Sequence, residues 1–301
     1  MASTVPPKSP YGTFQGTLFQ YAPPNLVAFD SDPSCPNKCI LLGGLSDGLI
    51  PTPYAKELEK KSTGWSLVQP LLCSSYLGFG NGDLDRDTKE LSQLLMYLKA
   101  HHGALSVAIV GHSTGCQNAI HFLKHGGEIK DLVQVVALQA PVSDREDAMT
   151  RPEYKTNMDQ ARTLKEQGKE QEMMPRSTFW APITVKRFLD LQEVKGGDDF
   201  FSSDLSNDEL VQRLGHVGQC DNLKALLVAF SGADEYVAQH VDSKDLTQRL
   251  CTAMNHHRQG VAIPLYLTKG NHNLSQSPGD ATMFVDKVVE LLHMASGDET
   301  L

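Results

Sequence analysis

Short apolar runs separated by segments with helical spacing form the main pattern of this chain. The runs lie at Cys39 to Gly43, Ser66 to Cys73, Leu105 to Val110, Val133 to Leu138, Leu223 to Phe230 and Val261 to Thr268. Such continuous runs are typical of strands buried on both faces. The segment Asp83 to His101 instead repeats leucine along one helical face and has an acidic start, which suits a helix N-terminus. The alternation predicts an α/β fold with a mostly parallel central sheet flanked by helices.

Two segments depart from this alternation. Gly16 to Asp30 contains two short strand-like runs around a Pro-Pro pair, which predicts an antiparallel hairpin at the sheet edge. Between Ser143 and Asp221 the buried runs stop and charged residues become frequent. Because so long an insertion between buried strands is more often a lid than a loop, we expect residues 143–221 to form a cap. Residues 1–142 and 222–301 would form the core.

The run that ends at Val110 breaks into Gly-His-Ser-Thr-Gly and continues at once as a helical sequence. This is the G-x-S-x-G nucleophile elbow, with the strand before it and the helix after it that the motif requires. The sharp turn tolerates only small residues two positions on either side of the serine, and Gly111 and Gly115 occupy those positions. We therefore predict that Ser113 is a nucleophile and that His112 packs beside the elbow. The alternative is a glycine-rich turn whose serine only caps the helix.

A nucleophilic serine needs a base and a group that orients the base. In this fold both come later in the chain, the acid before the histidine. Asp234 follows the apolar run that ends at Phe230, and His272 follows the run that ends at Thr268. We predict that His272 is the general base and that Asp234 orients it. Glu235 is the competing acid, and the position of Asp234 is the better match.

The negative charge that develops on the substrate needs two N–H donors. One is expected from the backbone of Thr114, the residue after the predicted nucleophile. The other is expected from the glycine-rich loop after an earlier strand, from Leu45 or Gly44, which the sequence leaves unresolved. A plain glycine turn at that position is the alternative.

Two aromatic residues are candidate substrate contacts. Tyr76 lies in a glycine-rich loop that follows a strand on the same sheet edge, and packing is an equally good role for it. Trp180 lies in the predicted cap among several phenylalanines, and we expect most of these aromatic side chains to pack the cap against the core. These aromatic residues of the predicted cap are Phe179, Trp180, Phe188, Phe200 and Phe201.

Composition narrows the class of protein. The 301 residues carry a formal net charge of −9 without a long basic run, which disfavours a nucleic acid or an anionic membrane as partner. The first residues show no signal-peptide pattern and no stretch approaches the ~20 apolar residues of a membrane span, so we expect a cytoplasmic protein. The six cysteines form no CxxC pair, so neither disulfides nor a metal site is expected.

The ordered residues Ser113, Asp234 and His272, with "LLGGLSDG" upstream, resemble the α/β-hydrolase superfamily over about residues 16–293. The stretches "GGLSDGL", "SSYLGFGNGDLDRD", "VGHSTGCQ" and "LQAPVSDRE" are similar to a branch found in fungi and plants. That branch includes intracellular esterases that cleave fusarinine-type ferric siderophores and release iron. The resemblance implies catalytic roles for the three ordered residues.

The expected function is therefore hydrolysis of a small-molecule carboxylic ester through an acyl-enzyme on Ser113, with a siderophore ester as the preferred substrate. This chemistry needs no metal and no organic cofactor. Alternatives are a generic carboxylesterase or lipase-like enzyme, an acyltransferase that uses the same residues, and a ligand-binding protein of the same fold without turnover. The sequence leaves the oligomeric state undetermined.

Overall fold

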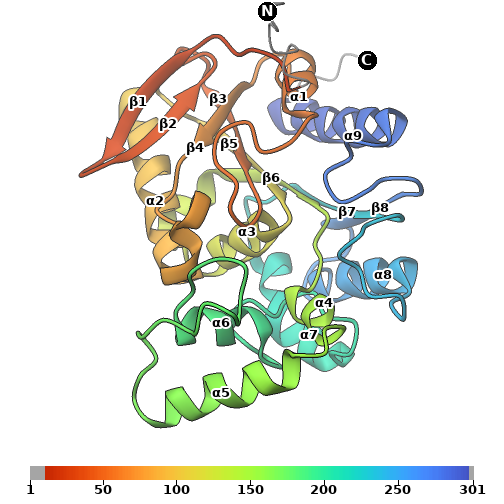
Figure 1. Ribbon diagram of the computed structural model, residues 1–301. Helices are drawn as coiled ribbons and strands as arrows, with labels where there is room; N and C mark the ends of the chain where they lie inside the picture. Colours follow the sequence, from red (N-terminus) through yellow and green to blue (C-terminus); the bar gives the residue numbers. More distant parts are fainter. Residues whose placement is uncertain (1–10, 298–301) are drawn as a thin grey trace, which may run out of the picture.

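The computed structural model describes residues 11–297, so the residues before Tyr11, from which we argued against a signal peptide, lie outside the described range. Within it, eight strands form one sheet in the order β1-β2-β4-β3-β5-β6-β7-β8 (Figure 1). β1 pairs antiparallel with β2, and β2 with β4, whereas all other neighbours are parallel. The strands are β1 (Thr17–Ala22), β2 (Leu26–Asp30), β3 (Asn37–Leu42), β4 (Ser66–Pro70), β5 (Ser106–His112), β6 (Val133–Gln139), β7 (Ala225–Ser231) and β8 (Ala262–Leu267).

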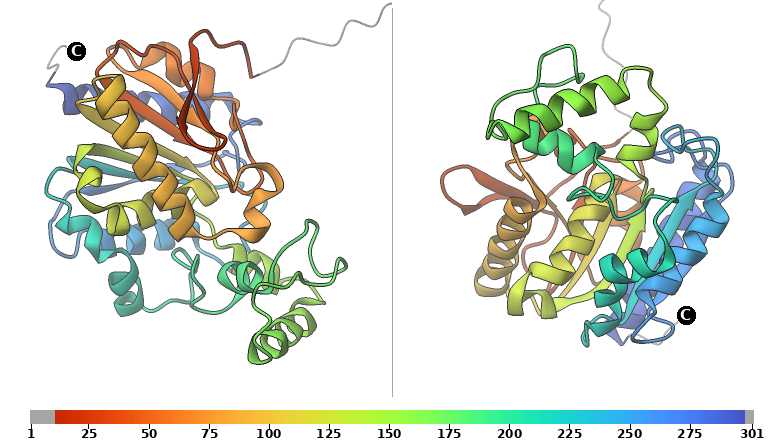
Figure 2. Two further views of the ribbon diagram at one scale, coloured as in Figure 1. Left: turned by 90° about the vertical axis from the view of Figure 1, so that its left-hand side faces the viewer. Right: turned by 90° about the horizontal axis from the view of Figure 1, so that it is seen from below.

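Helices cover both faces of the sheet (Figure 2). Alternate residues of a strand face opposite clusters: Ile40 and Leu42 of β3 pack with α2, α3 and α8, whereas Cys39 and Leu41 pack with α1 and α9. The helices are α1 (Ala55–Lys61), α2 (Leu84–His101), α3 (Thr114–His125), α4 (Asp144–Met149), α5 (Tyr154–Glu166), α6 (Val185–Gln192), α7 (Asn207–Leu214), α8 (Ser243–Met254) and α9 (Pro278–Ser296). Short 3-10 helices are η1 (Tyr76–Asn81), η2 (Gly127–Leu132) and η3 (Gly215–Gln219).

The predicted α/β fold with a mostly parallel sheet is confirmed, including the antiparallel hairpin at the edge. Element ends differ slightly from the sequence expectation. The run predicted to extend to Cys73 leaves the sheet after Pro70, because the chain turns where Ser75 N–H donates to the Leu72 carbonyl at 2.9 Å. The helix expected from Asp83 begins one residue later, since the Asp83 side chain caps it by accepting from Arg86 N–H at 2.9 Å.

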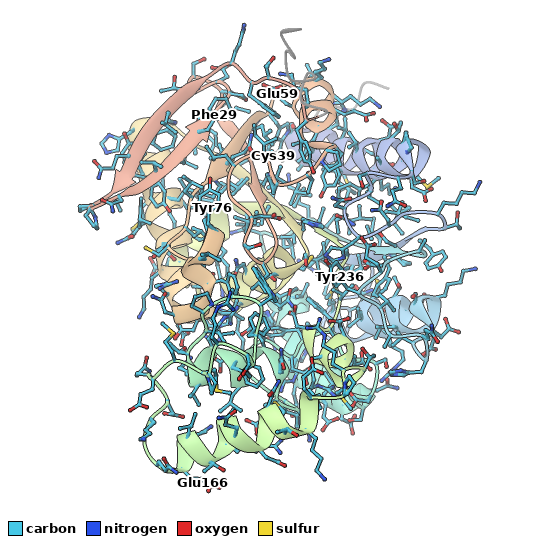
Figure 3. All side chains as sticks on the ribbon, in the orientation of Figure 1. Phe29, Cys39, Glu59, Tyr76, Glu166 and Tyr236 are labelled. Atoms are coloured by element: carbon cyan, nitrogen blue, oxygen red, sulfur yellow. The ribbon has the colours of Figure 1, made fainter. Side chains whose placement is uncertain are left out.

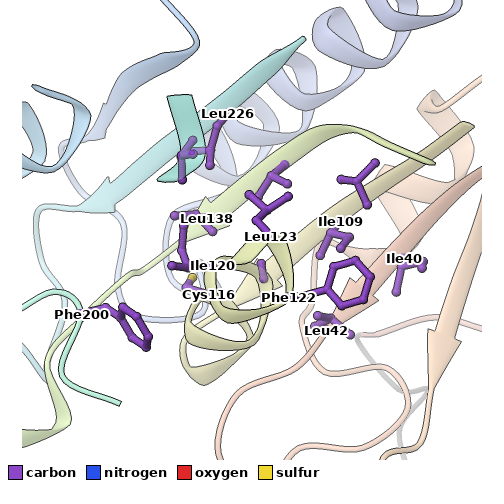
Figure 4. Packing of buried hydrophobic residues seen from close by; sticks show 14 of the residues in the cluster. Ile40, Leu42, Ile109, Cys116, Ile120, Phe122, Leu123, Leu138, Phe200 and Leu226 are labelled. Carbon is purple, nitrogen blue, oxygen red and sulfur yellow. The ribbon is translucent and has the colours of Figure 1, made fainter. Parts of the chain in front are cut away.

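Most buried apolar side chains of the predicted cap, residues 143–221, belong to two clusters. Those of α5 and α6 pack with Phe79 of η1 in a cluster of their own. Phe200, Phe201 and residues of α7 instead join the main core, and Figure 4 shows Phe200 near Cys116 and Ile120 of α3. The last part of the segment therefore packs as core. The action of the segment as a lid stays a prediction.

Three further observations concern residues 11–297. No helix in this range is both long enough and apolar enough to cross a membrane. The cysteines of the range are free thiols. The range also holds no group of three or more His, Cys, Asp or Glu side chains that could bind a metal ion.

Candidate active site

The turn between β5 and α3 holds Ser113 in a backbone conformation that L-residues rarely adopt, with φ at +52° and ψ at −122°. A Cβ on Gly111 would lie 2.4 Å from the Gly115 carbonyl oxygen, and a Cβ on Gly115 would lie 2.6 Å from the Leu42 oxygen. Both positions therefore require glycine for lack of space, as the elbow motif predicts. The Ser113 N–H donates to the Gln139 carbonyl at 3.0 Å, which joins the turn to the next strand.

Three side chains that are distant in sequence form one hydrogen-bonded chain at the carboxyl edge of the sheet. His272 Nε2 lies 2.9 Å from Ser113 Oγ, and His272 Nδ1 lies 2.8 Å from Asp234 Oδ2. The Asp234 side chain is fully buried, which shields this pair from water. Glu235 binds the backbone of His272 and not its ring, because its Oε2 accepts from the His272 backbone N–H at 2.9 Å. The geometry therefore pairs the imidazole with Asp234, the preferred one of the two acids.

The loop after β3 approaches the serine closely. A Cβ on Gly44 would lie 2.8 Å from Ser113 Cβ, so glycine is required there for contact. The Gly44 N–H donates to Asp47 Oδ2 at 2.7 Å. Leu45 N–H has no hydrogen-bond acceptor among residues 11–297, and Thr114 N–H is the first of α3, where helical N–H groups lack intrahelical partners. The geometry favours Leu45 over Gly44 as the second donor.

Gln139, at the end of β6, was not singled out from the sequence. Its fully buried amide connects the turn before Ser113 with the His272 loop: Oε1 accepts from His112 Nδ1 at 2.7 Å, and Nε2 donates to the His272 carbonyl at 2.9 Å. Tyr54 OH also donates to Gln139 Oε1, at 3.3 Å. Burial lowers the pKa of His112 to about 3, so its imidazole is neutral and Nδ1–H is the donor. No sequence motif marks such a residue.

A cavity of about 490 Å³ opens at Ser113. The sheet side contributes Gly44, Leu45 and His272, and the opposite wall comes from α4, the end of α6 and the Phe179–Trp180 pair. Trp180 lines this cavity and is 52% exposed, as a substrate contact would be. Its ring also lies 5.3 Å from that of Phe79.

Carboxylates outnumber cations in the lining of this cavity. Asp47, Asp144, Asp147 and Glu235 contribute, and Arg151 forms a 2.6 Å ion pair with Asp147. Burial raises the pKa of Asp144 to about 7, and the charge of Asp198 acts in the same direction. The negative charge of the lining therefore comes mainly from Asp47 and Glu235, and it suits a substrate that carries a positive charge.

Tyr76, the other predicted aromatic contact, is not among the residues that line this cavity in the described range. Its ring covers Gly48, where a Cβ would lie 2.3 Å from the tyrosine Cζ. Figure 3 labels Tyr76 on the α2 side of the molecule and Tyr236 on the β7 and β8 side. Tyr236 was not predicted from the sequence, yet its ring packs edge-on against His272 with the centroids 4.6 Å apart. Tyr236 lines the cavity and Tyr76 lies outside its wall.

Comparison with known proteins agrees with this architecture. The model of a family described as "Protein of unknown function (DUF1749)" matches residues 1–293. The fusarinine C esterase sidJ of Aspergillus fumigatus is 31% identical, with 84% of this chain and 86% of that protein covered. An esterase of Emericella nidulans is 29% identical, with 81% of each chain covered.

Solved structures show the same fold. The siderophore hydrolase EstB from Aspergillus fumigatus superposes with a TM-score of 0.80 at 28% identity, covering 94% of this chain and 98% of its own. A further α/β-hydrolase fold protein of unknown function gives a TM-score of 0.70 at 19% identity, covering 96% of this chain and 99% of its own. The resemblance to the α/β-hydrolase superfamily, and to the branch that includes siderophore esterases, is confirmed.

Proposed function

This chain belongs to the DUF1749 family and has the α/β-hydrolase fold, and on that basis we propose that it is a serine ester hydrolase. The observation that carries the proposal is the hydrogen-bonded chain from Ser113 Oγ through His272 to Asp234, with distances of 2.9 and 2.8 Å, at the wall of a cavity. Nucleophile, base and orienting acid are connected in this order in the Ser-His-Asp triads that catalyse acyl transfer.

In the first half of the reaction, Ser113 Oγ attacks the ester carbonyl carbon while His272 Nε2 takes the hydroxyl proton. Asp234 keeps the proton on Nδ1 and stabilises the imidazolium that forms. The carbonyl oxygen becomes an oxyanion and accepts hydrogen bonds from the N–H groups of Leu45 and Thr114. The bond to the alcohol then breaks, and His272 returns its proton to the leaving oxygen.

The second half repeats these steps with water. His272 takes a proton from a water molecule, whose oxygen attacks the acyl carbon bound to Ser113. The tetrahedral intermediate collapses, the bond to Ser113 Oγ breaks, and that oxygen regains its proton from His272. The products are a carboxylic acid, an alcohol and the free enzyme, and none of these steps requires a resident metal or an organic cofactor.

A fusarinine-type siderophore ester is the substrate we propose. The names of the relatives, a fusarinine C esterase and a siderophore hydrolase, support this choice. The carboxylates around the cavity, among them Asp47 and Glu235, provide independent support, because fusarinines with free amines carry positive charge. A role in iron release follows from this substrate. We further propose a cytoplasmic location, which the free cysteine thiols support.

The test compares the wild-type protein with Ser113→Ala on two esters, p-nitrophenyl acetate and a fusarinine-type siderophore, with products identified by mass. We expect serine-dependent cleavage of both, with kcat/KM much higher for the siderophore, and a loss in the variant of about 10⁴-fold or more. Serine-dependent cleavage of the simple ester alone would retain the esterase and refute the siderophore substrate. Silence on both esters, together with no fluorophosphonate labelling of the wild type, would refute catalysis.

A further inference from the structure

A second, smaller cavity lies on the other side of the loop that carries Leu45. It has a volume of about 30 Å³ and is lined by Gly44, Leu45, Asp87, Thr114, Asn118 and Arg187, among others. We call it the rear cavity. Gly44 and Leu45 line both cavities, so this loop separates the rear cavity from the catalytic one. A volume of roughly 10–15 Å³ is enough for one water molecule, so the rear cavity has room for one or two.

Four side chains in the lining of the rear cavity have a buried polar atom without a hydrogen-bond partner among residues 11–297. The atoms are Asp87 Oδ1, Thr114 Oγ1, Asn118 Oδ1 and Arg187 Nε. The four residues are only 4, 7, 6 and 3% exposed, respectively. Buried polar atoms in native proteins are nearly always paired with protein or with ordered water. Four such atoms around one cavity therefore indicate an occupant that forms hydrogen bonds.

The types of these atoms identify the occupant. Arg187 Nε–H is a donor, the oxygens of Asp87 and Asn118 are acceptors, and the Thr114 hydroxyl can be either. A cation is disfavoured by the guanidinium and an anion by the carboxylate. Water accepts from the donor and donates to the acceptors, and it is small enough. We propose that the rear cavity binds one or two ordered waters that position the Leu45 loop for catalysis.

The proposal rests on the proposed function, because the loop matters for catalysis only if Leu45 N–H binds the oxyanion. It also connects the cap segment to that loop. Arg187 comes from α6, and its Nη1 binds both carboxylate oxygens of Asp198, at 2.7 and 2.8 Å. These bonds hold the guanidinium in place and leave Nε–H for the water. Asp87, Asn118 and Arg187 are thus positioning residues that act on the oxyanion donor through bound water.

The first experiment is a wild-type crystal structure at a resolution that shows ordered waters. Density for a water within hydrogen-bond distance of Asn118 Oδ1, Asp87 Oδ1 or Arg187 Nε is the expected result. A dry cavity would overturn the proposal, and so would a bound ion with metal-like distances. This measurement does not depend on enzymatic activity.

The second experiment replaces the amide of Asn118 by an apolar group of similar size, Asn118→Leu. We expect kcat for p-nitrophenyl acetate to fall about 10- to 100-fold, since small displacements of catalytic donors have effects of that size. KM should stay within about twofold, because substrate contacts are unchanged. Gln134→Leu is the matched control: Gln134, near the start of β6, also has an unpartnered buried amide oxygen, but it is not in the lining of the rear cavity.

The outcomes separate the two proposals. An unchanged kcat in Asn118→Leu, in a protein that melts as the wild type does, would overturn the positioning role while the esterase stands. An equal loss of kcat in Gln134→Leu would also overturn it, because the effect would then be general. If the wild type shows no serine-dependent hydrolysis, the proposed function fails and with it the positioning role, and the crystal structure alone decides whether water binds.

Discussion

The two walls of the cavity at Ser113 differ in how their residues are held. On the sheet side, Ser113, Asp234 and His272 follow the ends of parallel strands, and close backbone contacts at glycines leave them little freedom. On the cap side, Asp144 lies at the start of a short helix and Trp180 lies in a loop with its ring half exposed. The sheet side is therefore suited to hold reactive atoms in register, and the cap side to select among substrates.

The cap side is nevertheless attached to the core at defined points. Thr184 N–H donates to the Gly80 carbonyl at 2.7 Å, and Lys186 forms an ion pair with Asp83 at 3.1 Å. Arg187 and its bonds to Asp198 lie beside them. The bonds of Thr184 and Lys186 join α6 to the segment before α2, whereas the Arg187–Asp198 pair lies within the cap segment. Substitutions on the sheet side should therefore lower kcat for every ester, and those on the cap side should change KM for large esters.

After Ser113→Ala, the largest effect is expected for Asp234→Asn. An amide in place of the carboxylate stabilises the wrong tautomer of His272, so kcat should fall about 10³- to 10⁴-fold on any ester. Steady-state hydrolysis of p-nitrophenyl acetate measures this loss. Glu235→Gln is the matched control and should cost less than about tenfold, because Glu235 binds only a backbone N–H of the histidine loop. A larger loss in Glu235→Gln than in Asp234→Asn would reverse the assignment.

A smaller loss is expected for Gln139→Met, which removes the bonds to both His112 and the His272 carbonyl. Because the histidine loop then loses a support, kcat should fall about 10- to 100-fold with little change in KM. Gln139→Glu keeps an acceptor for His112 and removes only the donor to His272. Equal losses in the two variants would assign the effect to the His272 bond. Unchanged kcat in both would exclude a positioning role for this residue.

On the cap side, Trp180→Ala should raise KM for a fusarinine-type siderophore about three- to tenfold and leave KM for p-nitrophenyl acetate unchanged. Only a large substrate reaches the indole, whose contact area the variant removes. Tyr76→Ala is the comparison, since Tyr76 was the other predicted contact and its ring covers Gly48. If Tyr76→Ala raises KM for the siderophore more than Trp180→Ala does, substrate contact lies on the sheet side as well.

The smallest effect concerns stability and pH at Asp144. Its pKa is raised to about 7 in the folded protein, so the folded state holds the proton more tightly than the unfolded chain. Wild-type stability should therefore fall as pH rises from about 4 to about 7, whereas the amide introduced by Asp144→Asn does not titrate. The melting temperature of Asp144→Asn minus that of the wild type should therefore increase by about 2–4 °C when the pH is raised from 5 to 8. Asp159→Asn, at an exposed position of α5, is the control. A difference between Asp144→Asn and wild type that stays constant with pH would refute this.

The sheet side was the part that sequence reasoning could predict. The elbow is local, because five consecutive residues carry the glycine spacing, the serine and the change from strand to helix. Asp234 and His272 could be placed because each follows an apolar run, and the carboxyl ends of parallel strands meet at one sheet edge. In each case a short stretch of sequence contained the information needed.

Other features depend on contacts that only the folded chain makes. The choice of Leu45 over Gly44 as donor depends on the Asp47 carboxylate, which occupies the Gly44 N–H. Gln139 can be identified only from its hydrogen bonds to His112 and His272, which are distant from it in the sequence. Phe200 was expected to pack the cap against the core, and it does so, but its contact with α3 depends on the chain returning to the core before α7. None of these contacts leaves a periodicity or a motif that a single sequence can show.

The close approach of Gly44 to Ser113 also restricts how this enzyme could evolve. Exchanging serine for cysteine keeps one unbranched heavy atom on Cβ. Threonine would add a methyl group there, at a residue with φ of +52° and beside a loop whose own extra Cβ would lie 2.8 Å from the serine Cβ. At this position a lineage can therefore exchange oxygen for sulfur more easily than it can add a single carbon atom to the side chain.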